Sequence, residues 1–251
     1  MSKHQIGYIG FGLFTIFYGF AYFLYDFPLG YYLIAFFVWI SLVAIGSFTV
    51  RCNYHINAIS SFKTSANQVA ITFDDGPSEF TDGVLDVLKK YDAKASFFCI
   101  GKHLEKFPDQ AKRIVSEGHA LGNHTYSHSK IGFTKKEVLV DEITQTDDLI
   151  EAYTERKSTL FRPPFGVTNP MIRRALLQTK HHVIGWNIRS LDTAIHDEKK
   201  VLNRITRQLK PGSIILLHDT AQQTSGILEQ LLLYLREHNF TCVSIEEILK
   251  K

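Results

Sequence analysis

The chain has 251 residues, with 28 Lys and Arg, 25 Asp and Glu, and a formal net charge of +3 at neutral pH. This length fits one sizeable domain with an appended segment, and so small a charge excess does not favour nucleic acid as a partner. The three cysteines, Cys52, Cys99 and Cys242, form no close pair. We interpret them as core residues instead of redox or metal sites.

Two uncharged apolar runs open the sequence, at residues 6–25 and 28–50. Each is long enough to cross a bilayer, which takes about 20 apolar residues at the helical rise. Tyr, Trp and Phe cluster near the ends of the runs, as amphipathic rings do at the level of the lipid headgroups. We therefore expect residues 1–50 to form two transmembrane helices, joined by a tight turn at Asp26.

Two other interpretations of these runs compete with the hairpin. A cleaved signal peptide would need a shorter apolar region and a small-residue cleavage site, and no such site precedes Asp26. The second competing interpretation is a pair of helices buried in a soluble core, but uncharged runs of this length are rare in a soluble core of this size. By the positive-inside rule, Lys3 before the hairpin and Arg51 and Lys63 after it favour a cytoplasmic location for both ends. These charges are few, so the side of the soluble part stays open.

The rest of the chain alternates between strand-like and helix-like runs. The mixed polar and charged composition of residues 51–67 predicts a juxtamembrane linker, and the soluble domain then covers residues 68–251. Strand-like runs lie at 68–73, 95–100, 119–124, 159–165, 181–186, 213–218 and 240–245, and helix-like runs at 80–91, 109–118, 134–155, 169–179, 199–209 and 225–238. This alternation predicts an α/β sheet or barrel with parallel strands and about seven strand–helix units.

Reactive side chains gather where the predicted strands end. They are Asp74 and Asp75 after the first strand, His124 and His128 after the third, Arg162 in the fourth, Arg189 and Asp192 after the fifth, and His218 at the end of the sixth. Parallel α/β folds build their sites at the carboxyl ends of their strands. We therefore expect these side chains to share one site.

Two histidines and a carboxylate in this group suggest a metal centre. The spacing of His124 and His128 would place both imidazoles on one face of a helical turn, and Asp75 would add an oxygen ligand. Two imidazoles and one carboxylate with open positions are typical of a hydrolytic zinc-type site. Adjacent Asp74 and Asp75 could also serve a helix cap or turn, but a cap needs only one of them. For both to face one site, the chain must bend after them, where Gly76 and Pro77 stand.

Four ordered motifs carry a family resemblance. The segments "TFDDGP" (residues 72–77), "HTYSH" (124–128), "RPPFG" (162–166) and "LLHD" (216–219) resemble the motifs of the polysaccharide deacetylase family, the NodB-type domain of carbohydrate esterase family 4. The resemblance covers the chain from about residue 68 onward. It implies a distorted (β/α)7 barrel that removes acetyl groups from a sugar with one divalent metal ion.

The resemblance assigns a role to each main site residue. It implies that Asp75, His124 and His128 bind the metal, that Asp74 is the general base and that His218 is the general acid. Zn²⁺ is the first choice for such ligands, with Co²⁺, Ni²⁺ or Mn²⁺ as alternatives. A carboxylate suits the base because it can take a proton from water, and an imidazolium suits the acid because the departing amine must be protonated.

Three further roles follow from the same resemblance. Arg162 would orient and electrostatically tune the base. The backbone N–H of Phe165 would hold the developing oxyanion, and Pro163 would lie beside it at the substrate. The fifth motif departs from the family pattern, because Arg189 stands where a first Asp is usual and a Thr where a Trp is usual. Asp192 is retained, and it would pair with Arg162 or with Arg189.

Three functions fit this pattern. The first is a membrane-anchored, metal-dependent hydrolase that removes N-acetyl groups from N-acetylhexosamine units of a cell-envelope polysaccharide, peptidoglycan or exopolysaccharide. The second is a deacylase or deformylase of a lipid-linked sugar at the cytoplasmic face of the membrane. The third, from another class, is an inactive glycan-binding or scaffold module, and retention of all five metal, base and acid residues disfavours it.

Overall fold

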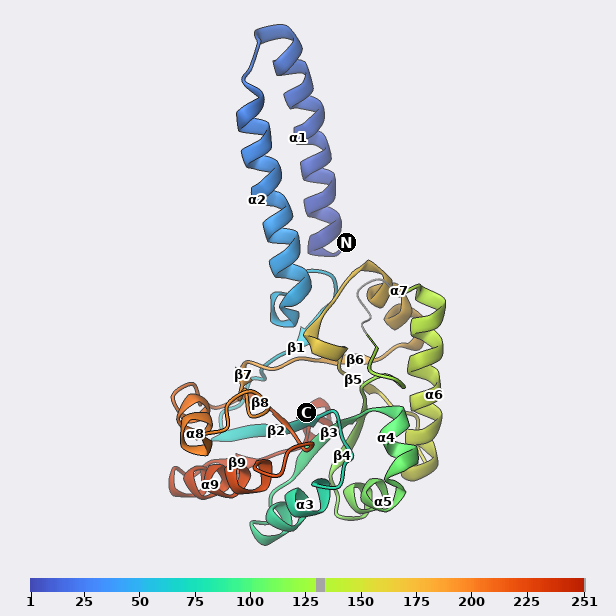
Figure 1. Ribbon diagram of the computed structural model, residues 1–251, viewed down its shortest axis with the longest axis vertical. Helices are drawn as coiled ribbons and strands as arrows, with labels where there is room; N and C mark the ends of the chain where they lie inside the picture. The colour runs from blue at the N-terminus through green and yellow to red at the C-terminus, as the bar shows by residue number, and fades with distance from the viewer. Residues whose placement is uncertain (130–133, 251) are drawn as a thin grey trace.

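A long helical hairpin projects from a rounded α/β domain (Figure 1). The computed structural model describes residues 1–129 and 134–250. The predicted domain at 68–251 includes residues 130–133 and 251, which lie outside the described residues. The hairpin leaves the domain beside β1 and β6, and the remaining helices surround the curled sheet.

The hairpin consists of α1 (Lys3–Tyr25) and α2 (Leu29–Phe48). Both helices are long and apolar enough to cross a membrane, judged by length and composition. They pack against each other through aromatic rings, such as Phe11 stacked on Trp39 with ring centroids 4.4 Å apart. Their other faces leave large apolar side chains exposed, including Phe17 and Phe37.

The described strands form one nine-stranded sheet in which every strand pairing is parallel. The spatial order is β1-β6-β5-β4-β3-β2-β8-β7, and β9 pairs with β2. The strands are β1 (Ala58–Ile59), β2 (Gln68–Asp74), β3 (Ala95–Cys99), β4 (Ala120–Asn123), β5 (Leu160–Phe161), β6 (His182–Ile184), β7 (Ile188–Arg189), β8 (Ile214–His218) and β9 (Thr241–Cys242). The curled sheet stays open, because β1 and β7 stand at the two ends of the strand order and do not pair with each other. This shape is the distorted barrel that the sequence predicts.

The sheet contains short strands that the sequence pattern does not reveal. A 3₁₀ turn at Val50–Cys52 leads into residues 51–67, the predicted linker. This segment contains β1, which pairs with β6 at the sheet edge. Strand β7 also has only two residues. Segments this short have no detectable hydrophobic period, so only their neighbours in space make them strands.

Helices connect most successive strands, as parallel pairing requires, but no helix lies between β1 and β2 or between β6 and β7. They are α3 (Thr81–Lys90), α4 (Gly101–Lys106), α5 (Pro108–Ser116), α6 (Lys136–Thr154), α7 (Pro170–Thr179), α8 (Glu198–Thr206), α9 (Thr224–Glu237) and α10 (Ile245–Leu249), with a further 3₁₀ turn at Pro164–Gly166. Local chemistry sets where they begin. Asn169 caps α7 by accepting a hydrogen bond from the N–H of Ile172, and Pro170 opens the helix.

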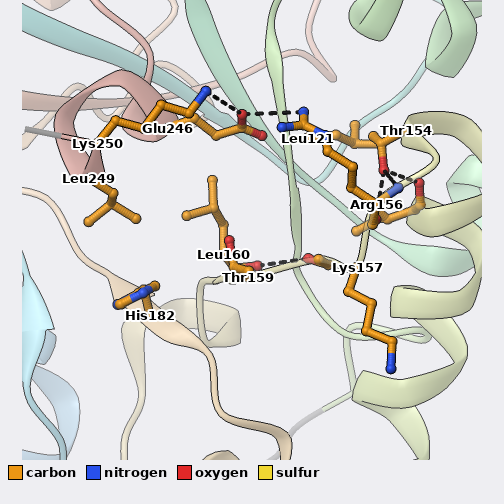
Figure 2. A pocket seen from close by; sticks show the side chains of 12 residues that line it. Leu121, Thr154, Arg156, Lys157, Thr159, Leu160, His182, Glu246, Leu249 and Lys250 are labelled. Carbon is orange, nitrogen blue, oxygen red and sulfur yellow. Dashed lines mark hydrogen bonds and ion pairs between the residues drawn. The ribbon is translucent and has the colours of Figure 1, made fainter.

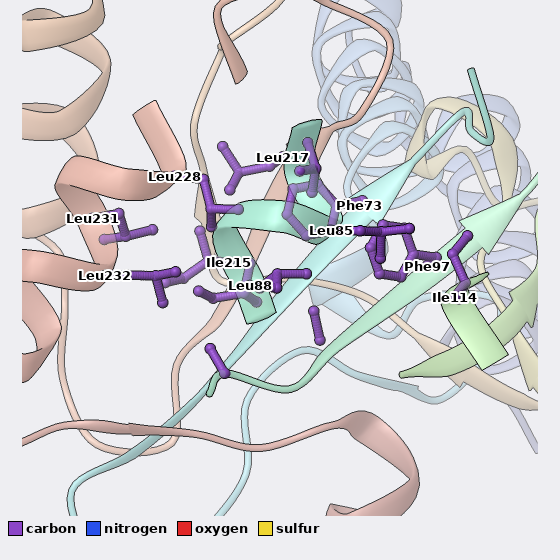
Figure 3. Close-up of a cluster of buried hydrophobic side chains, with 14 of the residues drawn as sticks. Phe73, Leu85, Leu88, Phe97, Ile114, Ile215, Leu217, Leu228, Leu231 and Leu232 are labelled. Atoms are coloured by element: carbon purple, nitrogen blue, oxygen red, sulfur yellow. The ribbon is translucent and has the colours of Figure 1, made fainter. Parts of the chain in front are cut away.

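The largest core cluster lies between the middle strands and helices α3, α5 and α9 (Figure 3). Phe73 on β2 stacks on Phe97 on β3, with ring centroids 4.8 Å apart, and both rings are fully buried. Leu85 from α3 and Leu228 from α9 lie in the same cluster. This packing holds the carboxyl ends of β2, β3 and β8 together, which is where the site residues lie.

Truncating this stack should destabilise the whole domain. We expect Phe97→Ala to lower the free energy of unfolding by about 3–5 kcal/mol, because it removes a buried ring and leaves a cavity. Thermal or denaturant unfolding of the full chain in detergent, followed by circular dichroism, measures this loss. Val138→Ala, at a half-exposed position on α6, is the control and should change stability by less than about 0.5 kcal/mol. Equal effects of the two changes would contradict this account of the core.

Candidate functional site

Strand register brings the predicted site residues together at the carboxyl ends of neighbouring strands. Asp74 at the end of β2 pairs directly with His218 at the end of β8. On the other side of β2, the backbone N–H of His124 bonds to the carbonyl of Cys99 on β3, and the N–H of Arg162 bonds to the carbonyl of Asn123 on β4. Four strands therefore deliver side chains to the same place.

Both carboxylates of the Asp74-Asp75 pair reach the site. Asp74 Oδ2 lies 3.8 Å from His124 Nε2, and Asp75 Oδ1 lies 3.4 Å from the same nitrogen. The chain bends at Asp75, whose φ is +71°, and the carbonyl of Asp75 binds Nδ1 of His103 at 2.7 Å. The bend expected from the Gly76-Pro77 pair thus begins one residue earlier, at Asp75 itself.

The two histidines and Asp75 form a cluster that suits a metal ion. One ligand atom from each of Asp75, His124 and His128 lies within 4.8 Å of the others. Asp75 Oδ1 is buried and has no hydrogen-bond partner among the described residues. Nδ1 of His124 binds the carbonyl of Arg162 at 2.7 Å, which directs the Nε2 lone pair to Asp75. A divalent cation would satisfy all three atoms, so the donor set fits such an ion.

The segment from His124 to His128 is an irregular loop, whereas the spacing predicted a helical turn. Thr125 and His128 have positive φ values of +66° and +51°. Side chains replace the helical hydrogen bonds, because Asn123 accepts from the N–H of Thr125 and Glu142 accepts from both the N–H and the hydroxyl of Ser127. The imidazoles still face each other, with ring centroids 4.9 Å apart.

Charge in the cluster is arranged for cation binding. Burial opposes ionisation of Asp75, but the imidazoles of His124, His128 and His218 outweigh it and hold the pKa of Asp75 at about 2. Burial, reinforced by His124, lowers the pKa of His128 below its ordinary value. An ionised carboxylate and a neutral imidazole are the forms that bind metals.

Arg162 is a fully buried cation beside Asp74. Its Nη1 donates to Asp74 Oδ1 at 2.6 Å and to the hydroxyl of Thr72 at 2.8 Å. Its other nitrogens donate to the carbonyls of Ile184 and Gly185 at the end of β6. Burial lowers the pKa of Arg162, and the charge of Asp74 works against that shift. The guanidinium thereby fixes one face of the Asp74 carboxylate and leaves the other toward the cluster.

Asp192 pairs with His218, whereas the sequence offered Arg162 or Arg189 as its partner. Its Oδ1 lies 2.9 Å from Nδ1 of His218, and its Oδ2 accepts the backbone N–H of His218 at 2.7 Å. Arg189 is exposed, and its carbonyl accepts a hydrogen bond from Arg204. Because Asp192 holds Nδ1, the Nε2 atom of His218 faces the site, 4.0 Å from Asp75 Oδ2.

The pKa of His218 is raised above its ordinary value. Burial lowers it, but the hydrogen bond and the charge of Asp192 together outweigh burial. Asp192 is itself fully buried, so its charge is weakly screened. This pairing favours a protonated imidazole beside the cluster.

Phe165 and Pro163 lie on the loop that follows Arg162. Phe165 has a φ of +59° within the short 3₁₀ turn, and its ring is exposed and lies 4.6 Å from the His128 ring. Pro163 is buried, and its carbonyl accepts the N–H of Gly166. The loop thus forms one wall of the site next to the cluster.

Two supporting residues have no assigned role in the sequence reasoning. Asp219 is buried directly against Gly76, where an added Cβ would lie 2.2 Å from the carboxylate, and it accepts a hydrogen bond from Thr81 at 2.6 Å. Burial raises the pKa of Asp219 to about 7. Glu142, on α6, holds the histidine loop. The "LLHD" motif pointed to Asp219, but no local signal marks Glu142 because its partner lies 15 residues earlier.

A separate cavity of about 250 Å³ lies at the amino ends of β5 and β6 (Figure 2). It is lined by Leu160 and His182, the first residues of β5 and β6, and by the ion pair of Arg156 with Glu246 at 3.4 Å. None of the predicted site residues lines it. This cavity is therefore distinct from the cluster of predicted site residues at the carboxyl ends of the strands.

Comparisons with known proteins agree with this fold. The sequence model described as "Polysaccharide deacetylase" matches residues 62–184. A peptidoglycan-N-acetylglucosamine deacetylase of Bacillus cereus is 32% identical over 72% of this chain and 88% of its own length. The chain belongs to the polysaccharide deacetylase family, carbohydrate esterase family 4. In another Bacillus cereus deacetylase of that name the match spans 56% of the relative's length.

Solved structures show the same fold. A peptidoglycan N-acetylglucosamine deacetylase, crystallised with a naphthalenyl N-oxidanyl-benzamide, is 30% identical, with a TM-score of 0.70 over 75% of this chain and 91% of that one. A pseudoenzyme of the same family from Bacillus anthracis is 27% identical, with a TM-score of 0.71 over 77% of this chain and 69% of that one. The fold therefore occurs in both active and inactive members.

Removing the buried guanidinium should cost more than removing the ion pair. We expect Arg162→Met to destabilise the chain by about 3–5 kcal/mol, because it leaves the Asp74 charge buried without a partner. The double variant Arg162→Met with Asp74→Asn should recover part of this loss. Unfolding of the two single variants and the double variant gives the coupling. Purely additive losses would show that the two side chains do not stabilise each other.

Proposed function

We propose that this chain is a metal-dependent hydrolase that removes N-acetyl groups from N-acetylhexosamine units of a cell-envelope glycan. One observation carries the proposal. Side chains suited to act as a base, an acid and a three-residue metal-ligand set meet at the carboxyl ends of the strands. His124 Nε2 lies 3.8 Å from Asp74 and 3.4 Å from Asp75, and His218 Nε2 lies 4.0 Å from Asp75. Membership of the family supports the reaction class, and the related deacetylases act on peptidoglycan according to their names.

In this proposal Asp75, His124 and His128 hold one divalent ion, with Zn²⁺ as the first choice. When bound, such an ion supplies Lewis-acid activation of water and of the acetyl carbonyl. Asp74 accepts the proton of the attacking water through Oδ2, because Arg162 occupies its Oδ1. His218 donates a proton from Nε2 to the departing amine nitrogen, since Asp192 occupies its Nδ1.

Phe165 contributes through its backbone in this proposal. Its N–H would donate to the oxygen that becomes negative as water attacks the carbonyl. The positive φ of Phe165 orients the turn, and the exposed phenyl ring beside His128 would contact the sugar together with the Pro163 segment. A small Thr at position 193 leaves that side of the site without the aromatic wall that the family pattern has.

We further propose that α1 and α2 cross the membrane and anchor the domain at its surface. Their length, composition and exposed apolar side chains support this arrangement. An inactive glycan-binding module is the competing function from another class. The chain retains Asp74, both histidines of the cluster and His218, and their side chains lie close together around Asp75. This arrangement favours the enzyme.

Acetate release tests the chemistry. The full chain in detergent, loaded with Zn²⁺, should release acetate from N-acetylglucosamine oligomers, and dialysis against a chelator should abolish the activity until the metal is restored. Asp74→Asn should keep the bound metal but lower kcat by about 10²–10⁴-fold, as loss of a general base does. His128→Ala should lose metal, whereas the exposed His196→Ala should not. Undiminished activity of Asp74→Asn would overturn the assignment of the base.

The pH profile tests the acid. Because His218 must be protonated to act, activity should fall as the pH rises through its pKa. Asp192→Asn removes the charge that raises this pKa, so the alkaline fall in kcat/KM should move to lower pH. Profiles of the metal-loaded wild type and variant, measured over the same range, provide the comparison. An unchanged alkaline limb would show that His218 does not set it.

A further inference from the structure

The end of α2 is joined to the loop that carries Phe165. The backbone N–H of Thr168 donates to the carbonyl of Ser47 at 2.8 Å, and Thr168 is buried. Its hydroxyl lies 3.5 Å from the carbonyl of Gly46. Val50, two residues beyond α2, is buried in the same cluster as Phe161. The helix therefore ends in the wall of the domain and not in a free connection.

Further contacts, from α1 and from α2, close this joint against Tyr54 and His55. The N–H of His4 donates to the carbonyl of Tyr54 at 3.0 Å. Gly46 lies so close to Tyr54 that an added Cβ would stand 2.4 Å from its ring. The hydroxyl of Ser47 bonds to Nε2 of the buried His55 at 2.9 Å. Contacts from both helices make the connection a packed interface, which resists bending far better than a flexible linker does.

This joint sets how far the site lies from the end of the hairpin. Phe165 and Thr168 are three residues apart, and three residues of fully extended chain span at most about 11 Å. Thr168 is hydrogen-bonded to the last turn of α2, and the Phe165 ring contacts the ring of His128. The catalytic cluster is thus held close to the end of α2 at a fixed distance.

The length of α2 relates that distance to a bilayer. Its 20 residues span about 30 Å, which matches the hydrocarbon thickness of a membrane. Phe48, its last residue, is 71% exposed, and Ile45 and Leu42 in the preceding turns are exposed as well. When α2 spans the membrane, Phe48 lies at the hydrocarbon boundary. The cluster then lies just beyond that boundary, at the level where a lipid carries its first sugar.

We propose that the substrate is a lipid-linked saccharide and that the N-acetylhexosamine deacetylated is the one nearest the lipid. This inference rests on the proposed hydrolase and on the membrane-spanning hairpin. A rigid joint keeps the cluster near the bilayer surface, so sugars farther along a chain lie out of its reach. A flexible tether would instead let the domain sample acetyl groups at many heights.

A series of lipid-anchored oligosaccharides tests the proposal. Each carries one N-acetylglucosamine, placed next to the lipid, in the middle or at the far end of an otherwise unacetylated chain. The full chain and one substrate are incorporated together in vesicles, and acetate release is followed. We expect kcat/KM for the lipid-proximal position to exceed that for the far end by about tenfold or more, since only the former reaches the cluster. Equal rates at all positions would overturn the proposal.

A lengthened joint is the matched control. An insertion of about twelve Gly and Ser residues between Phe48 and Thr49 would span about 20 Å on average. Combined with Gly46→Leu, whose side chain would collide with the Tyr54 ring, it would separate the end of α2 from the domain. This variant should keep the wild-type rate on soluble N-acetylglucosamine oligomers but lose the preference for the lipid-proximal sugar. A variant that keeps the full preference would contradict the role of the joint. Absence of acetate from every substrate, soluble oligomers included, would overturn the proposed hydrolase itself and the inference with it.

Discussion

The buried guanidinium of Arg162 organises the site. Its side chain bonds to Asp74 and Thr72 on β2 and to two carbonyls at the end of β6. It also lies over the Phe98 ring, with its central carbon 4.0 Å from the ring centroid. Its own carbonyl binds His124. A buried cation requires partners on every side. Arg162 therefore links β2, the end of β6 and His124.

Three aspartates of the site experience three different environments. Asp74 faces a buried cation, Asp75 lies among imidazoles that hold its pKa at about 2, and burial raises the pKa of Asp219 to about 7. They stand on neighbouring strands, so distance along the sheet does not separate their roles. Their contacts distinguish them instead. Asp74 contacts Arg162, Asp75 contacts the histidines, and Asp219 contacts Thr81.

The loop after Arg162 links the site to the hairpin. Within a few residues it contributes a carbonyl to His124, a ring to His128 and an N–H to Ser47 at the end of α2. Residues 51–67 are also attached to the domain, because β1 pairs with β6 at the sheet edge and the chain around it packs in a core cluster near the end of α2. The position of the site residues relative to the end of α2 is therefore set by the α/β domain itself.

Much of this protein follows from its sequence alone. Uncharged runs predict the two long helices, the alternation of runs predicts a curled parallel sheet, and strand-end motifs predict which side chains meet. These features depend on composition and local period, which a sequence displays directly. Short segments such as β1 and β7 lack a period, and they are strands only because a neighbour supplies hydrogen bonds.

Side-chain partners required the tertiary structure. Asp192 binds His218 and leaves Arg189 in solvent, although the sequence places Arg189 nearer to it. The histidine loop takes its irregular shape from Glu142 on a distant helix, and the contact of Thr168 with Ser47 joins residues 121 positions apart. Such pairings depend on which elements the fold brings together across the chain, and no local pattern of residues encodes that.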